Sequence, residues 1–515
     1  MIQAKLEKEG RYPQKVGVVL WATETTRNEG VNESTILSLM GVEPVWDKSE
    51  RVTGCRVIPG RSLGRPRIDV LINPSGLYRD MFPEKLVFLD KAVQKAMAQT
   101  DIENFLAGNK RRIKDALVAS GMDPAEADTQ SRFRIFTEKP GSYGNGVEEM
   151  VGASGLWEAD DAISNVYLNR AQFAVGQGRW AVPVKSAFKE NLRDVDVAVH
   201  SRSTNVIGII DTDDFFMYLG GMSLAVKNVR GTAPDTMVTM HRKKDELMVE
   251  DVEKTIGREM RTRYLNPQWI KGMQRDNYGG ARQMADFAEN LWGWQVTVPT
   301  AVDADKWQQV FEVYVEDKYG MELDEFFNQH NPWAYQSMTA RMLETVRKGY
   351  WQPEETVTRK LAAEYAVNVV EKGVACCDHT CNNPMLNQMV VNLISLPGVL
   401  SPEMVEKFKL AIEQMAAKKL EQQTSDRKVL LEKLKESPGR EKAADQGKAG
   451  KEKNSAEGKD GPAKAETVEG YKMEDVKTQD ETTDLTSSGV QWVASVFVLF
   501  IIGLFVWGVR RKGAL

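Results

Sequence analysis

The chain has 515 residues, of which 42% are hydrophobic, 27% charged and 8% aromatic, and its formal net charge is −5. This composition is that of a globular protein, and it excludes a collagen, a disordered chain and a bundle of membrane helices. The lack of a basic excess argues against nucleic acid as a partner, and four cysteines are too few for a disulfide scaffold of this length.

The portion 1–245 predicts an α/β fold with a parallel-sheet region. Short apolar runs alternate there with amphipathic ones, which is typical of β–α–β units. Strands are expected at 16–21, 52–59, 68–72, 195–200 and 236–241, and helices at 32–40, 82–97 and 215–226.

The portion 246–400 predicts mainly helices. Val252, Ile256 and Met260 keep a four-residue spacing, and Pro267 ends that helix. Further helices are expected near 304–317, 335–348 and 354–372.

An amphipathic helix is predicted at 401–437. Pro402 stands in its first turn, and Val405, Phe408 and Ile412 recur at three- and four-residue spacing. The resulting apolar stripe is expected to dock on the body of the protein or on a partner.

The C-terminal segments predict a tether and a membrane anchor. Residues 438–488 are polar and of mixed charge, which favours a disordered linker. Residues 489–509 carry no charge and suit a single transmembrane helix, since about 20 helical residues span a bilayer core, although a buried core helix is the alternative. The basic tail 510–515 then predicts a cytoplasmic C-terminus.

This orientation places the body outside the cytoplasm, at the cell membrane. Met1 begins a polar stretch without an apolar signal region. We therefore expect either a tail-anchored chain or one whose true N-terminus is missing.

The first candidate site is the segment 21–30, WATETTRNEG, which follows the first strand. Loops after parallel strands are where ligands bind in open α/β sheets. Glu24 and Arg27 place charges there. The alternative is a solvated turn with a capped helix.

The second candidate site is the segment 139–149, KPGSYGNGVEE, whose glycines let the backbone approach a ligand closely. Tyr143 and Glu148 supply polar groups. An ordinary surface turn is the alternative.

The third candidate site combines His200 with Asp211, Asp213 and Asp214. Three nearby carboxylates suit a cation, or a base whose pKa a like charge raises. Asp211 or Asp213 is also well placed to cap the following helix, and this would explain one of the three residues.

The fourth candidate site is Cys376, Cys377, His379 and Cys381, which fall within six residues. Thiolates and imidazole suit a soft or borderline metal. A disulfide from Cys381 and a turn of buried thiols are the alternatives.

Nine segments in order along residues 12–395 resemble the family of the cobaltochelatase large subunit, CobN, and the H subunit of magnesium chelatase. They are 21–30, 41–47, 63–70, 73–83, 139–146, 157–158, 211–221, 266–269 and 330–334.

The resemblance implies a tetrapyrrole substrate into which a divalent metal is inserted, with cobalt and a corrin precursor in cobaltochelatase and iron or magnesium as the other metals. ATP is then hydrolysed by separate AAA-type subunits, which fits the absence of a GxxxxGK[ST] motif. His200, Asp211, Asp213 and Asp214 would handle the metal or protons. Tyr143, Glu148 and Trp157 would contact the ring.

Two departures from the family pattern modify this expectation. Family members are more than twice as long, so the chain corresponds to their C-terminal portion, and an upstream half is expected as a further partner. The cysteine cluster and the predicted anchor resemble a membrane-anchored branch of anaerobic bacteria and archaea. The alternatives are a haem dechelatase and a non-catalytic tetrapyrrole or metal carrier.

Overall fold

The structure is a computed structural model that describes residues 1–243, 246–375, 379–380 and 382–436. The predicted linker, membrane segment and basic tail lie outside these residues. Within them, no helix is both long enough and apolar enough to cross a bilayer.

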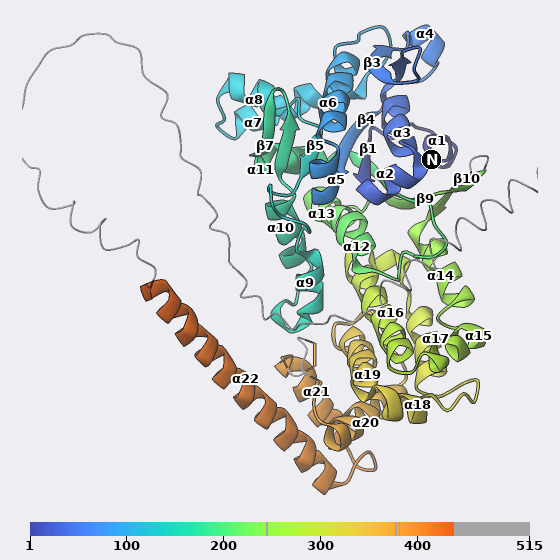
Figure 1. Cartoon of the computed structure of the whole chain (residues 1–515), viewed down its shortest axis with the longest axis vertical. Coiled ribbons are helices and arrows are strands. Elements are labelled where there is room, and N and C mark those ends of the chain that lie inside the picture. Colours follow the sequence, from blue (N-terminus) through green and yellow to red (C-terminus); the bar gives the residue numbers. More distant parts are fainter. Residues whose placement is uncertain (244–245, 376–378, 381, 437–515) are drawn as a thin grey trace, which may run out of the picture. The chain divides into compact units, whose positions relative to one another are not determined.

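The centre of the fold is a mixed sheet, which in the described part of the chain has the strand order β10-β9-β8-β1-β4-β5-β6-β7 (Figure 1). The strands are β1 Lys15–Leu20, β4 Asp69–Pro74, β5 Ile135–Thr137, β6 Phe173–Gly176, β7 Arg179–Pro183, β8 Val195–Arg202, β9 Asp235–Lys243 and β10 Glu246–Asp251. The neighbouring strands β9, β8, β1, β4 and β5 are parallel to one another. At the edges, β10 pairs antiparallel with β9, β6 with β5, and β7 with β6. The predicted α/β fold is confirmed, and the expected parallel sheet is extended by antiparallel hairpins at both edges.

Two predicted elements differ from the structure. The strand predicted at 52–59 is β3 Val52–Val57, which pairs with β2 Val42–Trp46 in a separate antiparallel hairpin. The helix predicted at 215–226 is divided into α12 Asp213–Phe215, a π-helical turn Phe216–Gly220 and α13 Gly221–Arg230.

Helices cover both faces of the sheet, and alternate strand residues enter two cores. Val18 packs with α3 Val31–Met40 and α6 Pro83–Met97, while Val19 packs on the opposite face, where α10 Asp161–Arg170, α11 Lys185–Leu192 and α13 lie. A Cβ on Gly17 would lie 2.5 Å from the Met222 Sδ atom, so glycine is what lets α13 approach β1 this closely.

The predicted helical portion is confirmed. Its helices are α14 Val252–Thr262, α15 Pro267–Arg275, α16 Asn277–Thr297, α17 Ala304–Tyr314, α18 Leu323–His330, α19 Pro332–Arg347, α20 Glu355–Lys372 and α21 Pro384–Ile394. The separately predicted amphipathic helix is α22 Pro402–Glu436. Val405 and Phe408 of α22 are buried in the same core as α16 and α19, so the amphipathic stripe docks on the body.

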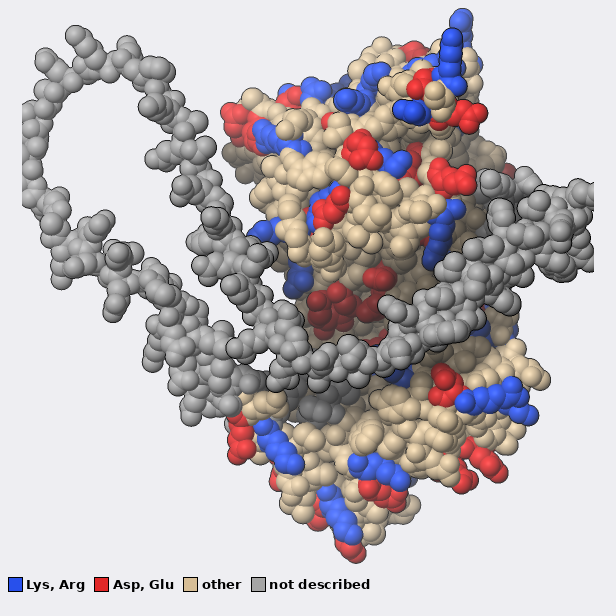
Figure 2. Space-filling model, viewed as in Figure 1, with Lys and Arg blue, Asp and Glu red and all other residues tan. Residues whose placement is uncertain are grey.

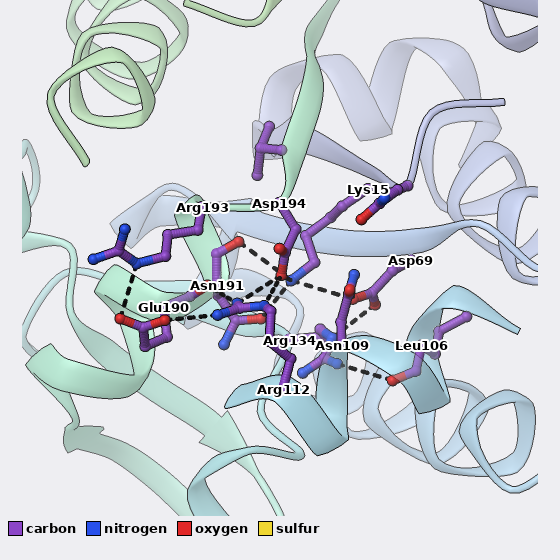
Figure 3. Close-up of polar contacts among 12 residues, drawn as sticks. Lys15, Asp69, Leu106, Asn109, Arg112, Arg134, Glu190, Asn191, Arg193 and Asp194 are labelled. Carbon is purple, nitrogen blue, oxygen red and sulfur yellow. Dashed lines mark hydrogen bonds and ion pairs between the residues drawn. The ribbon is translucent and has the colours of Figure 1, made fainter. Parts of the chain in front are cut away.

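A buried ionic cluster joins the amino-terminal ends of β1 and β4 (Figure 3). The side chains of Lys15, Asp69 and Arg134 have no solvent exposure. Asp69 lies 3.1 Å from the Lys15 Nζ atom and accepts a 2.7 Å hydrogen bond from Arg134 and a 3.0 Å bond from Asn109 of α7 Phe105–Ala119. Lys15 also donates to the Asn191 side chain of α11, at 2.9 Å.

The electrostatics of this cluster favour the charged form of its carboxylate. Burial acts to raise the pKa of Asp69, but Arg134 and Lys15 outweigh it and hold that pKa below its usual range. The carboxylate therefore stabilises the fold above its unfolded-state pKa, and this contribution is lost as the pH falls.

We predict that Asp69→Asn lowers the free energy of unfolding at neutral pH by about 3–5 kcal/mol, because it leaves the buried Arg134 without its carboxylate partner and Lys15, among the described residues, with only Asp194, at 3.7 Å. Denaturant unfolding measures the change. The control is Asp115→Asn, which alters an exposed side chain of α7 and should stay within about 0.5 kcal/mol of the parent. Equal effects of the two substitutions would contradict the role given to the cluster.

Candidate functional site

A cavity of about 390 Å³, here called the strand-end cavity, opens at the carboxyl ends of β1, β4 and β8. This is where parallel α/β sheets bind ligands. It brings together the first two candidate segments and part of the third. Its lining is Trp21, Thr23, Glu24, Arg27, Ser75, Leu77, Tyr143, Gly144, Arg202, Thr204, Ile207, Thr212, Asp214, Phe215, Met217 and Tyr218.

Glu24 ties the loop after β1 to the end of β8. It is 3% exposed and accepts hydrogen bonds from Ser203 at 2.9 Å and Ser201 at 3.2 Å. Arg27 lies 3.7 Å from the same carboxylate, but its side chain is 48% exposed. Glu24 therefore fixes the wall, and Arg27 offers a cation at the rim.

Tyr143 forms another part of the rim, with 66% of its surface exposed. Its hydroxyl donates to Asp80 at 2.8 Å, and Asp80 also pairs with the fully buried Arg79. A Cβ on Gly76 would lie 2.4 Å from the Ser142 carbonyl oxygen, so glycine is needed for the Tyr143 loop to rest on α5 Gly76–Met81.

Two further cavities adjoin the first. One of about 320 Å³, here called the acidic cavity, is lined by Glu148, Asp211, Thr212, Asp213, Phe216, Arg282, Asp286, Glu289 and Asn290. Another, of about 460 Å³, is lined by Val206, Ile207, Ile210, Asp211, Thr212, Arg263, Tyr264, Trp269, Gln283, Asp286 and Phe287. Thr212 lines all three cavities. Figure 2 shows acidic side chains gathered in a hollow where α9 Val147–Gly152, α12 and α16 lie in Figure 1.

The carboxyl groups of these cavities differ in how easily they ionise. Burial, and then the charges of Glu149 and Asp213, raise the pKa of Glu148 to about 8 against the effect of its own backbone. Partial burial of the carboxyl group and the charge of Asp213 also raise the pKa of Asp214, which lines the strand-end cavity and is exposed to solvent. Glu148 therefore holds a proton near neutral pH, where an ordinary glutamate has lost it.

Asp211 is held differently from its neighbours. Its two oxygens accept hydrogen bonds from Arg263, Tyr264 and the Gly208 backbone, which clamp the loop after β8. The expectation that Asp211 or Asp213 caps the next helix is wrong, because the N-cap of α12 is Thr212, whose hydroxyl accepts from the Asp214 backbone. The Asp211 carboxylate bonds to Arg263, Tyr264 and Gly208 instead of the first turn of α12.

Two predicted site residues lie beneath the cavity surfaces. His200 is 1% exposed, and burial lowers its pKa to about 3, an effect that the Val19 backbone opposes. Trp157 is 4% exposed, lies 6.1 Å from Trp292 between ring centroids, and has the Lys348 ammonium 3.7 Å from its own ring centroid. Neither residue lines any of the three cavities.

Of the fourth candidate cluster, Cys376, Cys377 and Cys381 lie outside the described residues. His379 is buried, shares a 2.9 Å hydrogen bond with Ser337 and lies 4.0 Å from Glu289 of the acidic cavity. In the described ranges, no group of three or more His, Cys, Asp or Glu side chains has the spacing of a metal site.

Sequence reasoning missed the contribution of α16 to the acidic cavity. Asp286, Glu289 and Asn290 are spaced three and four residues apart on α16, so they share one face, and Arg282 lies one turn earlier on it. That polar stripe was the signal in the sequence. Asn290 also donates to the Ile210 carbonyl at 3.2 Å and so braces the loop before Thr212.

These features define a class of protein, an α/β protein with a cleft, lined in part by carboxylates, at the carboxyl ends of a mostly parallel sheet. The comparison with known families gives the particular one. The chain belongs to the CobN/Magnesium Chelatase family, whose model matches residues 1–358.

Individual relatives agree with this assignment. The chain is 32% identical to the aerobic cobaltochelatase subunit CobN of Pseudomonas aeruginosa, over 68% of this chain and 28% of that protein. It is 30% identical to the H subunit of magnesium chelatase from Chlorobaculum parvum, over 70% of this chain and 28% of that protein.

A solved structure matches as well. The catalytic subunit of cobaltochelatase from Mycobacterium tuberculosis superposes with a TM-score of 0.67 at 29% sequence identity, covering 71% of this chain and 30% of that one. The chain therefore spans less than a third of the length of these relatives.

We predict that Glu148→Gln stabilises the protein increasingly as the pH rises. Between the unfolded-state pKa, about 4.3, and the folded-state pKa, about 8, the unfolded chain releases a proton that the folded chain keeps, so the wild type loses stability with rising pH. The glutamine variant lacks this loss, and its advantage should level off above the folded-state pKa.

Thermal unfolding across this pH range measures the difference. The control is Glu253→Gln, which removes an exposed carboxylate of α14. The same trend in the control would contradict the assignment to Glu148.

Proposed function

We propose that this chain is the tetrapyrrole-binding part of a metal chelatase that inserts a divalent cation, cobalt, into a corrin precursor. The observation that carries the proposal is the strand-end cavity with its aromatic wall, placed directly beside the acidic cavity, with Thr212 in the lining of both. A flat macrocycle needs apolar contacts on its faces, and metal insertion needs groups that accept protons at its centre. Family membership agrees with both requirements.

The ring lies in the strand-end cavity, whose volume falls within the range of about 300–1,000 Å³ for small-molecule sites. Phe215 and Met217 supply apolar surface for its faces. Tyr143 covers the open side, and Arg27 pairs with a carboxylate on the ring periphery.

The acidic cavity receives the metal and the displaced protons. Insertion of a divalent cation releases two protons from the pyrrole nitrogens, and carboxylates beside the ring take them up. Asp214 lines the strand-end cavity, Asp213 lines the acidic cavity, and Glu148 completes the acidic wall. Because the pKa of Glu148 is about 8, this residue passes protons in the neutral to mildly alkaline range.

The other parts of the chelatase are supplied by a further portion of polypeptide and by partner subunits. Since the chain spans less than a third of its relatives, an upstream portion completes the enclosure of the ring. AAA-type partner subunits hydrolyse ATP, in keeping with the lack of a GxxxxGK[ST] motif in the sequence. The segment 489–509 anchors the chain in the cell membrane, with its C-terminus in the cytoplasm and its body outside.

The test begins with ring binding by the full chain in detergent. Metal-free corrin and free-base protoporphyrin are titrated into the protein while absorption and fluorescence are followed, and Co²⁺, Mg²⁺ or Fe²⁺ is then added to the bound ring. We expect saturable binding of a ring and faster uptake of metal than by the same ring in detergent alone.

Asp213→Asn and Asp214→Asn should slow metal uptake by about 100-fold or more, because positioned proton transfer contributes about 10²–10⁴-fold to a rate. Ring affinity should change only a few-fold. Asp115→Asn again serves as the control.

Binding of neither ring, or wild-type uptake in both aspartate variants, contradicts the proposal. Loss of the Soret band of added haem with release of iron would identify a haem dechelatase instead. Haem that binds without change would identify a carrier.

A further inference from the structure

His200 is a buried polar side chain whose ring nitrogens lack a well-aligned hydrogen bond. It is 1% exposed, and within the described part of the chain neither nitrogen has a hydrogen bond of normal geometry; the Val19 backbone offers one of them a weak bond, which opposes the effect of burial on the pKa. Buried polar groups in folded proteins are nearly always paired, so an imidazole left unpaired in a core calls for an explanation. Leucine would fill the same space without this cost.

The imidazole lies one aromatic layer behind the wall of the strand-end cavity. Its ring centroid is 4.1 Å from that of Trp21 and 5.1 Å from that of Phe215, and both of these residues line the cavity. Only the thickness of one ring therefore separates His200 from the space that a ligand would occupy.

The Trp21 side chain covers His200 through ring contacts and, among the described residues, without a polar bond at its indole nitrogen. Its indole Nε1 atom is also buried without a hydrogen-bond partner in the described ranges, so no polar contact there holds the indole in place. The residue is half-buried at the start of α2 Ala22–Asn28 and borders the cavity. Rotation of the indole toward the cavity mouth would give its N–H access to water and would expose the imidazole.

We propose that His200 is an axial ligand for the metal at the centre of a bound tetrapyrrole, and that Trp21 is the cover that moves aside when the ring binds. This inference rests on the proposed function and adds to it a coordinate bond from the protein to the metal. An imidazole nitrogen donates its lone pair to the metal, and no electron or proton is transferred.

The burial of His200 suits this role. A neutral imidazole has a free lone pair, and burial keeps the pKa of His200 near 3, so the ring is uncharged throughout the physiological range. Axial ligation also discriminates between metals. Cobalt, iron, magnesium and zinc accept an axial nitrogen on a tetrapyrrole, whereas nickel and copper favour square-planar coordination.

The test uses cobalt(II) protoporphyrin bound to the full chain in detergent. Five-coordinate cobalt(II) with one axial nitrogen gives an electron paramagnetic resonance signal that is split by that nitrogen. We expect this splitting in the wild type and its complete loss in His200→Ala, with the signal restored by free imidazole that enters the vacated space.

Two further variants separate loss of the ligand atom from disruption of the core. His200→Phe keeps an aromatic ring in the core without a ligand atom, and it should also lose the splitting while still binding the porphyrin. Trp21→Ala removes the cover and should keep the splitting. As a further control, His330→Ala alters a histidine at the end of α18, distant in sequence and outside the cavity lining, and should resemble the wild type.

The outcomes separate the two proposals. Porphyrin binding with no nitrogen splitting in the wild type, or with the same splitting in His200→Ala and His200→Phe, overturns the ligand assignment and leaves the proposed function standing. Loss of the splitting in His330→Ala with retention in His200→Ala also overturns it and assigns the bond elsewhere. Failure of the wild type to bind any tetrapyrrole overturns both.

Discussion

The position of the whole site depends on the buried pairing of Asp69 with Lys15 and Arg134. Lys15 and Asp69 are register partners at the first positions of β1 and β4, and the same register pairs Leu20 with Pro74 at the other ends. Locking the amino-terminal ends therefore determines where the two strands finish. The strand-end loops that form the cavity meet because the strands beneath them cannot slide.

The carboxylates around the cavities fall into two groups, those paired with hydrogen-bond donors and those with raised pKa values. Glu24 and Asp211 are paired with hydroxyl groups, guanidinium groups or backbone N–H groups, and each holds a loop to a neighbouring element. Glu148 and Asp214 have raised pKa values because their burial is poorly compensated and they stand near like charges. The paired carboxylates hold the loops in place, and these loops and their neighbours surround the two carboxyl groups whose pKa values are raised.

The sequence predicted the central strands and most helices, because long apolar runs and regular helical spacing are local signals. It did not predict β5, which has three residues, or the short hairpin of β6 and β7. These strands form at the edge of a sheet that already exists, so their stability comes from pairing with it rather than from their own composition.

The candidate site could be predicted from the sequence to about the same extent as the fold. Glu24 and Arg27 were identified because loops after parallel strands bind ligands, and Tyr143 because its segment is rich in glycine. The burial of His200 and Trp157 was not predicted. The sequence at the end of a strand or in a loop does not indicate whether a side chain faces the cavity or the core behind it. The part played by α16 depends on contacts such as Asn290 with Ile210, which are 80 residues apart in the chain.

The docking of α22 has a consequence for how this protein is divided into modules. The family match ends at residue 358, yet the apolar core continues without interruption through α20 and α21 to Phe408, whose ring contacts Tyr365. The end of the family match is therefore not the end of the folded core. A fragment cut at the family boundary would expose the interior of the molecule, and the acidic cavity would lose His379 beside Glu289, so the segment after residue 358 belongs to the same cooperative unit as the site.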